Sequence, residues 1–330
     1  MTATTEMTYR QAIALAMMEE MELDPTVLLL GEDVGCFGGA MAASKGVFDK
    51  FGSRRVIDTP ISEAAIIGAG LGAAITGLRP IVEIMFIDFT GVCMDQIANQ
   101  VAKVRYMLGG QVSVPLVIRT QGGAGKSYAA QHSQSLEVWF AAIPGLKVVM
   151  PATPADAKGL LKSAIRSNDP VLFIEHKLLY GEKGQVPTDV QFLLPLGKAE
   201  VVRPGRDVTI VSYSRQLLMS LSAAQALAAN GIDCEVIDLR TISPPDMDTI
   251  LASLEKTGRL LVVEEGHKSF GVGAELSARV MEQGFDLLEG PVRRVATLDT
   301  PIPFSPVLEK AAIPNPDKIA AAVKDMLGAT

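Results

Sequence analysis

The sequence has few of the residues that build disulfide frameworks and metal centres. Its 330 residues include only three cysteines and three histidines. Cys36, Cys93 and Cys234 lie far apart, and no Cys-x-x-Cys pair occurs. Three dispersed cysteines do not make a disulfide framework, and the cysteines and histidines lack the close spacing of zinc ligands, so the sequence predicts neither kind of site. The rarity of cysteine is typical of a protein from a reducing compartment.

Long hydrophobic runs and an excess of positive charge are also absent. Apolar runs such as Val27–Leu30 have the length of strands, whereas a membrane span needs about 20 residues. Thirty Lys and Arg residues stand against 37 Asp and Glu residues, a net charge of −7. This balance argues against nucleic acid or an anionic membrane as a partner. The first residues show neither a signal peptide nor a transit pattern, so we expect a soluble, cytoplasmic protein.

Short apolar strands alternate with segments of helical period along nearly the whole chain. Helices are predicted over residues 60–76, 93–107 and 316–327, among others. Strands joined by helices of this length indicate parallel βαβ units. Residues 177–206 are rich in glycine and proline and interrupt the alternation. We therefore predict two α/β domains, over residues 1–190 and 206–330, with the connection inside 177–206.

A glycine-rich segment, Thr120-Gln-Gly-Gly-Ala-Gly-Lys-Ser127, follows an apolar strand and ends as a phosphate-binding P-loop does. The first glycine of the G-x-x-x-x-G-K-[ST] pattern is replaced by Thr120, however. No apolar helix follows whose N-terminus would face a phosphate. A P-loop nucleotide-binding protein is therefore a remote alternative, which nucleotide binding by the isolated chain would support.

A second glycine pattern, Gly68-Ala-Gly70-Leu-Gly72-Ala73, fits the G-x-G-x-x-A of dinucleotide-binding folds, and Glu83 ends a later strand. That fold places its glycines at the turn between a strand and a helix. Here the preceding residues are themselves helical. A helix that packs closely on a neighbour through its glycines explains the same letters.

Two polar residues are candidates for proton transfer. Glu63 lies one turn into an apolar, glycine-rich helix. It is either a favourable charge near a helix N-terminus, or a semi-buried carboxyl with a raised pKa that shares a proton with a ligand. His132 follows the glycine-rich loop near the carboxyl end of a strand. It is either a surface residue or a group that moves protons.

Sequence blocks along the chain converge on one family. They include Asp58-Thr-Pro-Ile-Ser-Glu63, Gly77-Leu-Arg-Pro-Ile-Val-Glu-Ile-Met-Phe86, Ala130-Gln-His-Ser-Gln134 and Phe270-Gly-Val-Gly-Ala-Glu275. With these blocks the sequence resembles the beta subunits of the thiamine diphosphate-dependent 2-oxoacid and acetoin dehydrogenases, over essentially its whole length. The segments Phe86–Ile97 and Lys177–Gly181 look most like the acetoin branch, and pyruvate dehydrogenase beta subunits share the wider pattern.

The resemblance implies a fold and an assembly. Two three-layer αβα domains are expected: a pyrimidine-binding thiamine diphosphate domain, then a domain like the C-terminal domain of transketolase. Such beta subunits form α₂β₂ heterotetramers with alpha subunits, and thiamine diphosphate binds where the two kinds of subunit meet. The Gly-Asp-Gly motif that holds the diphosphate and Mg²⁺ belongs to the alpha subunit, and this sequence has none.

The resemblance also assigns roles to residues. Glu63 corresponds to the glutamate that hydrogen-bonds N1′ of the aminopyrimidine, which helps the cofactor lose its reactive proton. His132 corresponds to a histidine that handles protons during transfer to the lipoyl group of the acyltransferase component. Phe89 stands where some members have a tyrosine beside the pyrimidine, and Met85 where branched-chain members have glutamine.

Some members hold a structural potassium ion, largely through main-chain carbonyls. By position, that site would involve Leu116, Ala164, Ile165, Ser167 and Asp169, and Ser167 replaces an aspartate. Carbonyl ligands leave no side-chain signature in a sequence.

The leading interpretation is the beta subunit of an acetoin dehydrogenase, which cleaves acetoin and passes an acetyl unit to lipoamide. The alternative inside the same family is a pyruvate dehydrogenase beta subunit. From another class we retain a noncatalytic scaffold, which would be favoured if Glu63→Ala left the assembled enzyme active.

Overall fold

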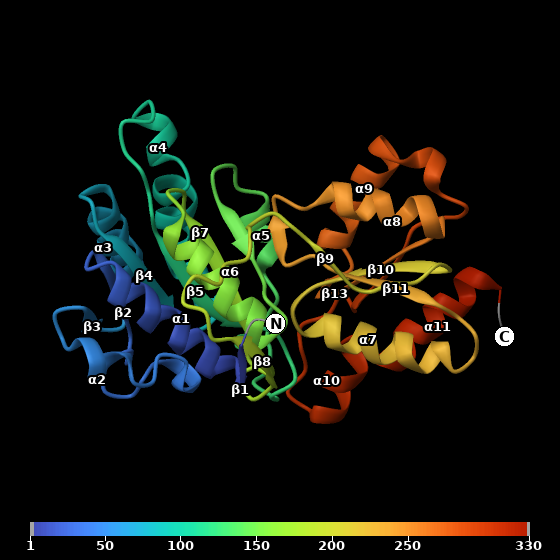
Figure 1. Cartoon of the computed structure of the whole chain (residues 1–330), viewed down its shortest axis with the longest axis horizontal. Coiled ribbons are helices and arrows are strands. Elements are labelled where there is room, and N and C mark those ends of the chain that lie inside the picture. Colours follow the sequence, from blue (N-terminus) through green and yellow to red (C-terminus); the bar gives the residue numbers. More distant parts are fainter. Residues whose placement is uncertain (1–2, 329–330) are drawn as a thin grey trace. The chain divides into compact units, whose positions relative to one another are not determined.

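The computed structural model describes residues 3–328, which form two units of mixed helix and sheet (Figure 1). Unit 1 contains the chain up to Gly122 together with Trp139–Leu196. Unit 2 contains Gly123–Val138 and the chain from Gly197 onward. The segment 123–138, which includes His132, thus belongs to the same unit as the C-terminal part of the chain, from Gly197 onward.

Unit 1 is built on a parallel sheet. Its strands follow the order β6 (Lys147–Val149), β7 (Val171–His176), β5 (Val117–Gly122), β4 (Arg79–Ile84), β2 (Val27–Gly31) and β3 (Val56–Asp58). The central strands are buried along their length, as expected of strands covered on both faces. The predicted parallel βαβ architecture is confirmed here.

Two helices of unit 1, α1 (Tyr9–Leu23) and α6 (Pro154–Arg166), lie side by side and contact each other. Buried ion pairs join them, including Lys158 Nζ to Glu19 Oε1 at 2.8 Å. A capping box at Thr8 begins α1, and another at Thr153 begins α6. Unit 1 also contains β1 (Thr4–Thr8), η1 (Ala40–Ala42), α2 (Val47–Phe51), α3 (Glu63–Ile75) and β8 (Lys183–Pro187).

The helix predicted over 93–107 is not continuous. The chain forms a 3₁₀ segment η2 (Ile87–Cys93), a π-helical segment η3 (Gln96–Val101) and a short helix α4 (Val104–Met107). The wider π-turn removes the regular ladder, and Lys103 Nζ donates to the Ala98 carbonyl at 2.8 Å. The stretch 177–206 is also more regular than its composition suggests, because β8 pairs antiparallel with β1.

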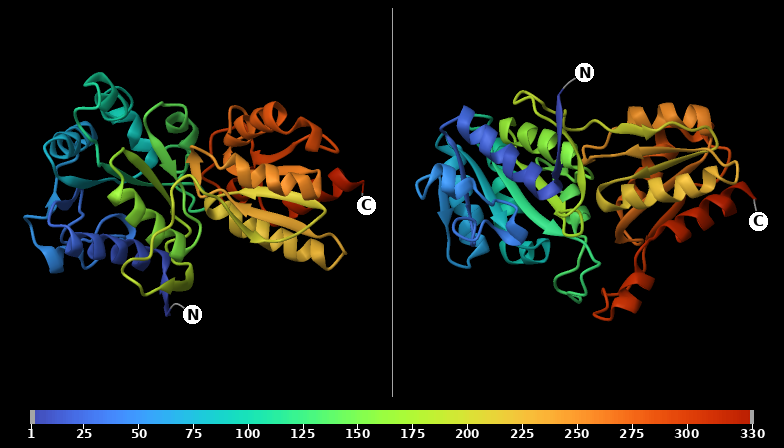
Figure 2. Two further views of the ribbon diagram at one scale, coloured as in Figure 1. Left: turned by 45° about the horizontal axis from the view of Figure 1, so that its top comes forward. Right: turned by 60° about the horizontal axis from the view of Figure 1, so that its bottom comes forward.

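Unit 2 has its own sheet, in the order β14 (Arg293–Thr297), β13 (Leu260–His267), β10 (Val208–Ser212), β11 (Cys234–Asp238) and β9 (Glu200–Arg203). Only β9 runs antiparallel among these pairings. Helices α8 (Met247–Thr257) and α9 (Val272–Gln283) cover one face, while α7 (Ser214–Ala228) and α11 (Pro316–Leu327) cover the other (Figure 2). Short elements of unit 2 are β12 (Thr241–Ser243), η4 (Phe285–Leu287) and α10 (Pro306–Ala312). The helix α5 (Glu137–Ala141) has its first two residues in unit 2 and the rest in unit 1.

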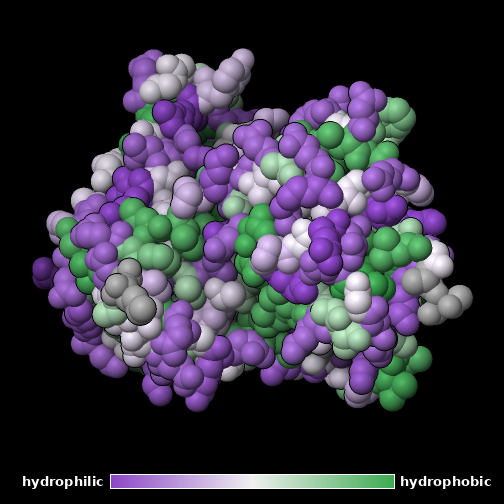
Figure 3. Space-filling model, turned by 45° about the vertical axis from the view of Figure 1, so that its right-hand side comes forward, coloured by the Kyte–Doolittle hydropathy of each residue, from purple (hydrophilic) through white to green (hydrophobic). Residues whose placement is uncertain are grey.

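The surface view mixes hydrophilic residues with several hydrophobic patches (Figure 3). Within residues 3–328, no helix has the length and apolar character needed to cross a membrane. All three cysteines are free; Cys36 is exposed, whereas Cys93 and Cys234 are buried.

Candidate functional site

In unit 1, three parallel strands end at the same edge of the sheet. Gly31 at the end of β2 pairs with Asp58 at the end of β3 and with Glu83 near the end of β4. The segments that leave these strands carry Glu32, Glu63 and the run from Met85 on. Because ligands of open α/β sheets bind outside the carboxyl ends of the strands, this edge is the first place to look for a site.

Glu63 is the first residue of α3 and is half-buried. Ser62 precedes it as N-cap, but the Ser62 side chain makes no capping hydrogen bond. Burial first, and then the charge of Glu63, raises the pKa of Glu32 above its ordinary value. The same two causes raise the pKa of the Cys93 thiol to about 12, which keeps that thiol protonated. The Glu63 carboxyl therefore acts on both neighbours at this edge.

Met85 and Phe89 are apolar residues of the chain that leaves β4 at this edge. Met85 directly follows β4, Phe89 lies in η2, and both are half-buried. The Phe89 ring packs edge-on against Phe86, with 5.5 Å between the ring centroids. The helix α3, which begins with Glu63, contacts β4 and η2. Phe89 lies in η2, and Met85 lies in the short link between β4 and η2.

Glu83 is engaged in the core beneath this edge. Arg119 Nη1 donates to Glu83 Oε2 at 2.7 Å, and Arg119 Nε donates to Glu175 Oε1 at 2.7 Å. Burial opposes the charge of Arg119, but Glu175 and Glu83 raise its pKa above the ordinary value. Glu83 Oε1 also accepts the Ala40 N–H at 3.0 Å. A ribose-binding acid must face its ligand, so Glu83 does not fit the dinucleotide interpretation.

The glycines of α3 lie inside the helix and not at its start. A Cβ atom on Gly70 would lie 2.5 Å from Val82 Cγ1 and 3.2 Å from Leu116 Cδ1, whereas one on Gly72 would meet nothing within 4 Å. Gly70 therefore lets α3 approach β4 closely. This close packing explains the glycine pattern without a dinucleotide.

In unit 2, the glycine-rich loop that follows β5 has alternating backbone conformations. Gly123, Gly125, Ser127 and Ala129 have positive φ angles of 87°, 101°, 56° and 61°. Such alternation turns successive N–H groups toward one point and makes an anion-binding nest.

The anions bound by this nest are carboxylates of the same chain. Glu309 accepts the N–H groups of Gly125 at 2.7 Å and Ser127 at 3.0 Å. Glu265 accepts the Ala124 N–H at 2.7 Å. A phosphate would have to displace these two buried carboxyl groups from the N–H groups, so the loop geometry argues against the P-loop alternative.

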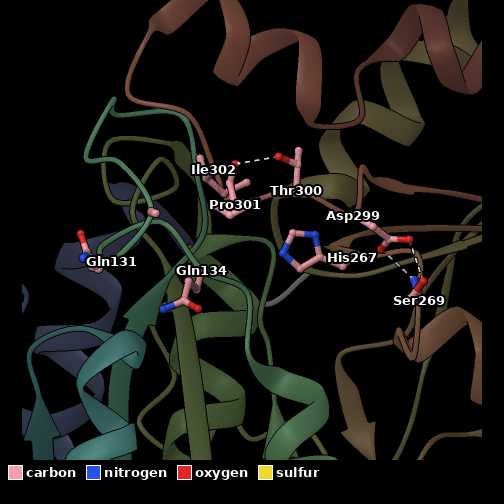
Figure 4. Close-up of a pocket in the computed structure, with 9 residues that line it drawn as sticks. Gln131, Gln134, His267, Ser269, Asp299, Thr300, Pro301 and Ile302 are labelled. Atoms are coloured by element: carbon pink, nitrogen blue, oxygen red, sulfur yellow. Dashed lines mark hydrogen bonds between the residues drawn. The ribbon is translucent and has the colours of Figure 1, made fainter.

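His132 lies half-buried in the continuation of this loop. Its neighbours Ala130, Gln131 and Gln134 line a cavity of about 630 Å³ within unit 2. Other walls come from the ends of β13 and β14 and the chain that follows them: His267, Ser269, Asp299, Thr300, Pro301 and Ile302 (Figure 4). The segment that carries His132 therefore borders an open cavity.

The cavity wall opposite the loop is polar and ordered by hydrogen bonds. His267 Nδ1 lies 2.8 Å from the Leu298 carbonyl oxygen. Asp299 accepts the Ser269 hydroxyl at 2.6 Å and the Ser269 N–H at 3.2 Å. These two hydrogen bonds lower the pKa of Asp299, so its carboxylate is charged at neutral pH.

The residues of the predicted potassium site make internal contacts. The carbonyl oxygens of Leu116 and Ala164 accept backbone N–H groups. Arg79 donates to the Ile165 carbonyl at 2.9 Å and to the Ser167 carbonyl at 2.6 Å. Asp169 pairs with Lys147 at 3.0 Å and also with Arg105. The Arg79 guanidinium thus places positive charge at two of the expected carbonyl ligands.

Three glutamates near these features have no role in the sequence-based interpretation. Glu32 is visible in the sequence as the residue that directly follows a buried strand, but the sequence assigns it no role. Glu265 and Glu309 carry no local signal, since they lie 141 and 184 residues from the N–H groups that they accept. Among the described residues, no group of three or more His, Cys, Asp or Glu side chains could hold a metal ion.

Comparisons with known proteins match both units to domain families. The transketolase pyrimidine-binding domain matches residues 5–183, and the transketolase C-terminal domain matches residues 197–319. A solved structure of a split-gene transketolase, described as an inactive beta4 tetramer, superposes with a TM-score of 0.81 at 23% identity. That likeness covers 98% of this chain and 99% of the other and supports the fold alone.

Curated relatives are similar over nearly the whole chain. The pyruvate dehydrogenase E1 component subunit beta of Rhizobium meliloti is 49% identical and aligns over 98% of this chain and 70% of its own. The acetoin:2,6-dichlorophenolindophenol oxidoreductase subunit beta of Bacillus subtilis is also 49% identical, over 96% of each chain. The counterpart from Cupriavidus necator gives 49% over 97% of each chain.

These matches confirm the family resemblance and the predicted fold class, and none supports a P-loop protein. The equal identities do not separate the acetoin branch from the pyruvate branch. With both domains matched in order and the relatives aligned almost from end to end, the chain belongs to the family of beta subunits of the pyruvate dehydrogenase E1 component and the acetoin oxidoreductases.

Proposed function

We propose that this chain is the beta subunit of a thiamine diphosphate-dependent oxidoreductase that cleaves acetoin and transfers an acetyl unit to a lipoyl group. The observation that carries the proposal is the contact of α3, which begins with Glu63, with β4 and η2 in the region that matches the pyrimidine-binding domain. Phe89 lies in η2, and Met85 links β4 to η2. The similarity to acetoin oxidoreductase beta subunits supports the substrate. Oxidative decarboxylation of pyruvate is the second candidate, because its beta subunits are equally similar.

The edge suits the pyrimidine half of thiamine diphosphate. A half-buried carboxyl and half-buried apolar side chains lie on neighbouring segments, and a flat, amine-bearing heterocycle needs both kinds of group. When bound, the cofactor supplies a nucleophilic carbon and an electron sink for C–C cleavage. Glu63 would hold or share a proton at N1′ of the pyrimidine, while Phe89 and Met85 would orient the ring and exclude water from it.

His132 would move protons during transfer of the acetyl unit to the lipoyl group. The loop that carries His132 borders a cavity that is open at the surface of unit 2. A histidine side chain is suited to proton transfer near neutral pH. This role concerns the second half of the reaction, whereas Glu63 acts in the first half.

The proposed partners follow from the family. An alpha subunit would provide the diphosphate and Mg²⁺ site in an α₂β₂ heterotetramer, and a lipoyl-bearing dihydrolipoamide acyltransferase would receive the product. Cytoplasmic location remains part of the proposal. Potassium at Leu116, Ala164, Ile165, Ser167 and Asp169 also stays a prediction, and the contacts of Arg79 speak against it. Thermal unfolding in matched potassium and sodium buffers tests this prediction. Equal midpoint temperatures in the two buffers would refute it.

The deciding experiment is co-expression of this chain with the alpha gene nearest to it. The purified complex is compared on acetoin and pyruvate by thiamine diphosphate-dependent reduction of 2,6-dichlorophenolindophenol. Preference for acetoin supports the proposal. Preference for pyruvate keeps the sites and moves the protein to the decarboxylating branch, and activity with neither, nor with branched-chain 2-oxoacids, contradicts the proposed reaction.

A further inference from the structure

The loop that carries His132 is held by carboxylates from distant parts of unit 2. Glu309 lies on α10, and its side chain is 3% exposed although Val307 and Leu308 beside it are 76% and 57% exposed. The short helix therefore turns its one glutamate inward. Both oxygens of that glutamate accept loop N–H groups, Gly125 on Oε1 and Ser127 on Oε2.

A second carboxylate holds the start of the same loop. Glu265 on β13 accepts the Ala124 N–H on Oε1, and its Oε2 accepts Gln216 Nε2 at 3.0 Å and lies 3.7 Å from an Arg215 nitrogen. Gln216 and Arg215 thus fix Glu265 from the side away from the loop. A charged acceptor on a backbone N–H is worth more than a neutral one, particularly where water is excluded.

Apolar contacts support the same attachment. Ala124 forms a small buried cluster with Ile302 and Ile313, the residues that lie before and after α10. The alternating positive φ values at Gly123, Gly125, Ser127 and Ala129 are unfavourable for the two non-glycine residues. A loop in this conformation persists only where its surroundings stabilise it.

We propose that Glu309 and Glu265 are positioning residues that hold the loop 123–129 in its nest conformation and thereby fix where His132 stands. The inference deepens the proposed function, since it rests on His132 acting in lipoyl acylation. Neither glutamate touches substrate or cofactor in this account. Each acts through the backbone that it holds. We call the attachment of the loop 123–129 to Glu309 on α10 the latch.

The latch is tested directly by hydrogen–deuterium exchange on the purified complex. Glu309→Gln replaces one acceptor oxygen by an NH₂ group that faces a backbone N–H, so amides of the segment 123–131 should exchange at least about tenfold faster than in the wild type. Glu275→Gln is the matched control, because Glu275 is exposed and forms an ion pair with Arg279 on its own helix. Unchanged exchange in 123–131 would overturn the latch.

If Glu309→Gln does not yield a folded complex, Glu309→Asp is measured by the same exchange experiment. Aspartate keeps the carboxyl group, but its side chain is one methylene shorter and no longer reaches the loop N–H groups. The positioning role is tested by separating the two half-reactions. Glu309→Gln should slow acetylation of lipoyl domain about tenfold or more while dye reduction stays within about twofold, as His132→Ala should do. A proportional loss in both half-reactions would indicate a merely structural effect and overturn the role.

The two proposals fail in different ways. If His132→Ala leaves both half-reactions unchanged, the proposed role of His132 is wrong, and the exchange measurement still decides whether Glu309 holds the loop. If exchange accelerates in Glu309→Gln but lipoyl acylation does not slow, the latch exists and its positioning role is refuted.

Discussion

Unit 2 contains a buried carboxyl that should make the protein less stable in alkaline solution. Glu264 on β13 is fully buried, and its Oε1 accepts the Gly273 N–H at 3.1 Å. Burial first, and then the charge of the neighbouring Glu137, raises the pKa of Glu264 to about 8. The N–H groups at the start of α9 and the charge of Arg294 oppose this rise only in part. At neutral pH the Glu264 carboxyl is therefore mostly protonated.

The consequence for stability follows from the direction of this change. Because the pKa in the folded protein lies above the ordinary value of 4.5, the folded state binds this proton more tightly than the unfolded chain does. The resulting stabilisation is complete below pH 4.5 and is lost as the pH rises through 8. At about 1.4 kcal/mol for each pH unit in that interval, the loss reaches at most about 5 kcal/mol.

Glu264→Gln removes the titration while it keeps an oxygen that can accept the Gly273 N–H. The free energy of unfolding of the full chain, measured in urea at a series of pH values, should fall from pH 5 to pH 9 in the wild type and fall less in the variant. Near pH 5 the two proteins should agree within about 1 kcal/mol, because the protonated glutamate and glutamine are nearly isosteric. At pH 9 the variant should be more stable by several kcal/mol.

Glu275→Gln serves as the control, because this side chain lies on α9 and is exposed, unlike the buried Glu264. Its curve should follow the wild type at every pH. Burial also raises the pKa of Glu137, to which the Tyr213 hydroxyl donates at 2.8 Å, so Glu264→Gln flattens the wild-type slope without abolishing it. Parallel curves for wild type and Glu264→Gln would refute the reasoning.

Three further outcomes are expected. Glu63→Gln should lower thiamine-dependent dye reduction by the complex at least about 100-fold with little change in unfolding, since the amide cannot exchange a proton; equal activity in the two assembled enzymes would remove the role of Glu63. His132→Ala should reduce lipoyl acylation about 100-fold and leave dye reduction nearly intact, which stopped-flow and lipoyl-domain acetylation assays can separate. Gly70→Ala should destabilise the chain by about 1–3 kcal/mol, because its methyl group would press on Val82, whereas Gly72→Ala should be neutral or stabilising; similar urea midpoints for both variants would contradict the packing argument.

The sequence predicts most of the regular elements of both units, because buried parallel strands and amphipathic helices have distinct periods. The closing helix is predicted over 316–327 and is observed as Pro316–Leu327. The helix predicted from residue 60 begins only at Glu63, so the candidate carboxyl belongs to the first residue of the helix. Element existence is thus well encoded locally, and boundaries shift by a few residues.

The strands β1 and β8 and the helix α10 are among the elements that escape this kind of prediction, because no inward-facing apolar period marks them. The strands β1 and β8 are short and partly exposed, and each is stabilised by pairing with a segment about 180 residues away. The helix α10 has only seven residues, and its large apolar side chains Val307 and Leu308 point outward. A periodicity search looks for an apolar face turned inward, so a short helix anchored by a buried glutamate gives no such signal.

In the candidate site, too, residues with a local sequence signal are predicted, and residues that act on distant parts of the chain are not. Glu63 and His132 stand out because each is a titratable residue in an unusual local setting. The attachment of the His132 segment to unit 2 depends on Glu265 and Glu309, and nothing near either residue marks it as a partner of the loop. Only the folded backbone brings these carboxylates to the N–H groups that they accept.

The loop after β5 shows why a motif can look like a phosphate site and serve another purpose. Alternating glycine and small residues allow the alternating φ angles that aim N–H groups at one point, and any anion of suitable size satisfies them. A free phosphate requires the nest to be empty and reinforced by a cation, as the lysine of a P-loop does. Here two buried carboxylates occupy the N–H groups, and the loop lysine, Lys126, is exposed. The same backbone geometry that would bind a nucleotide instead attaches the loop to the protein, which is what a residue that must keep a fixed position, such as His132, requires.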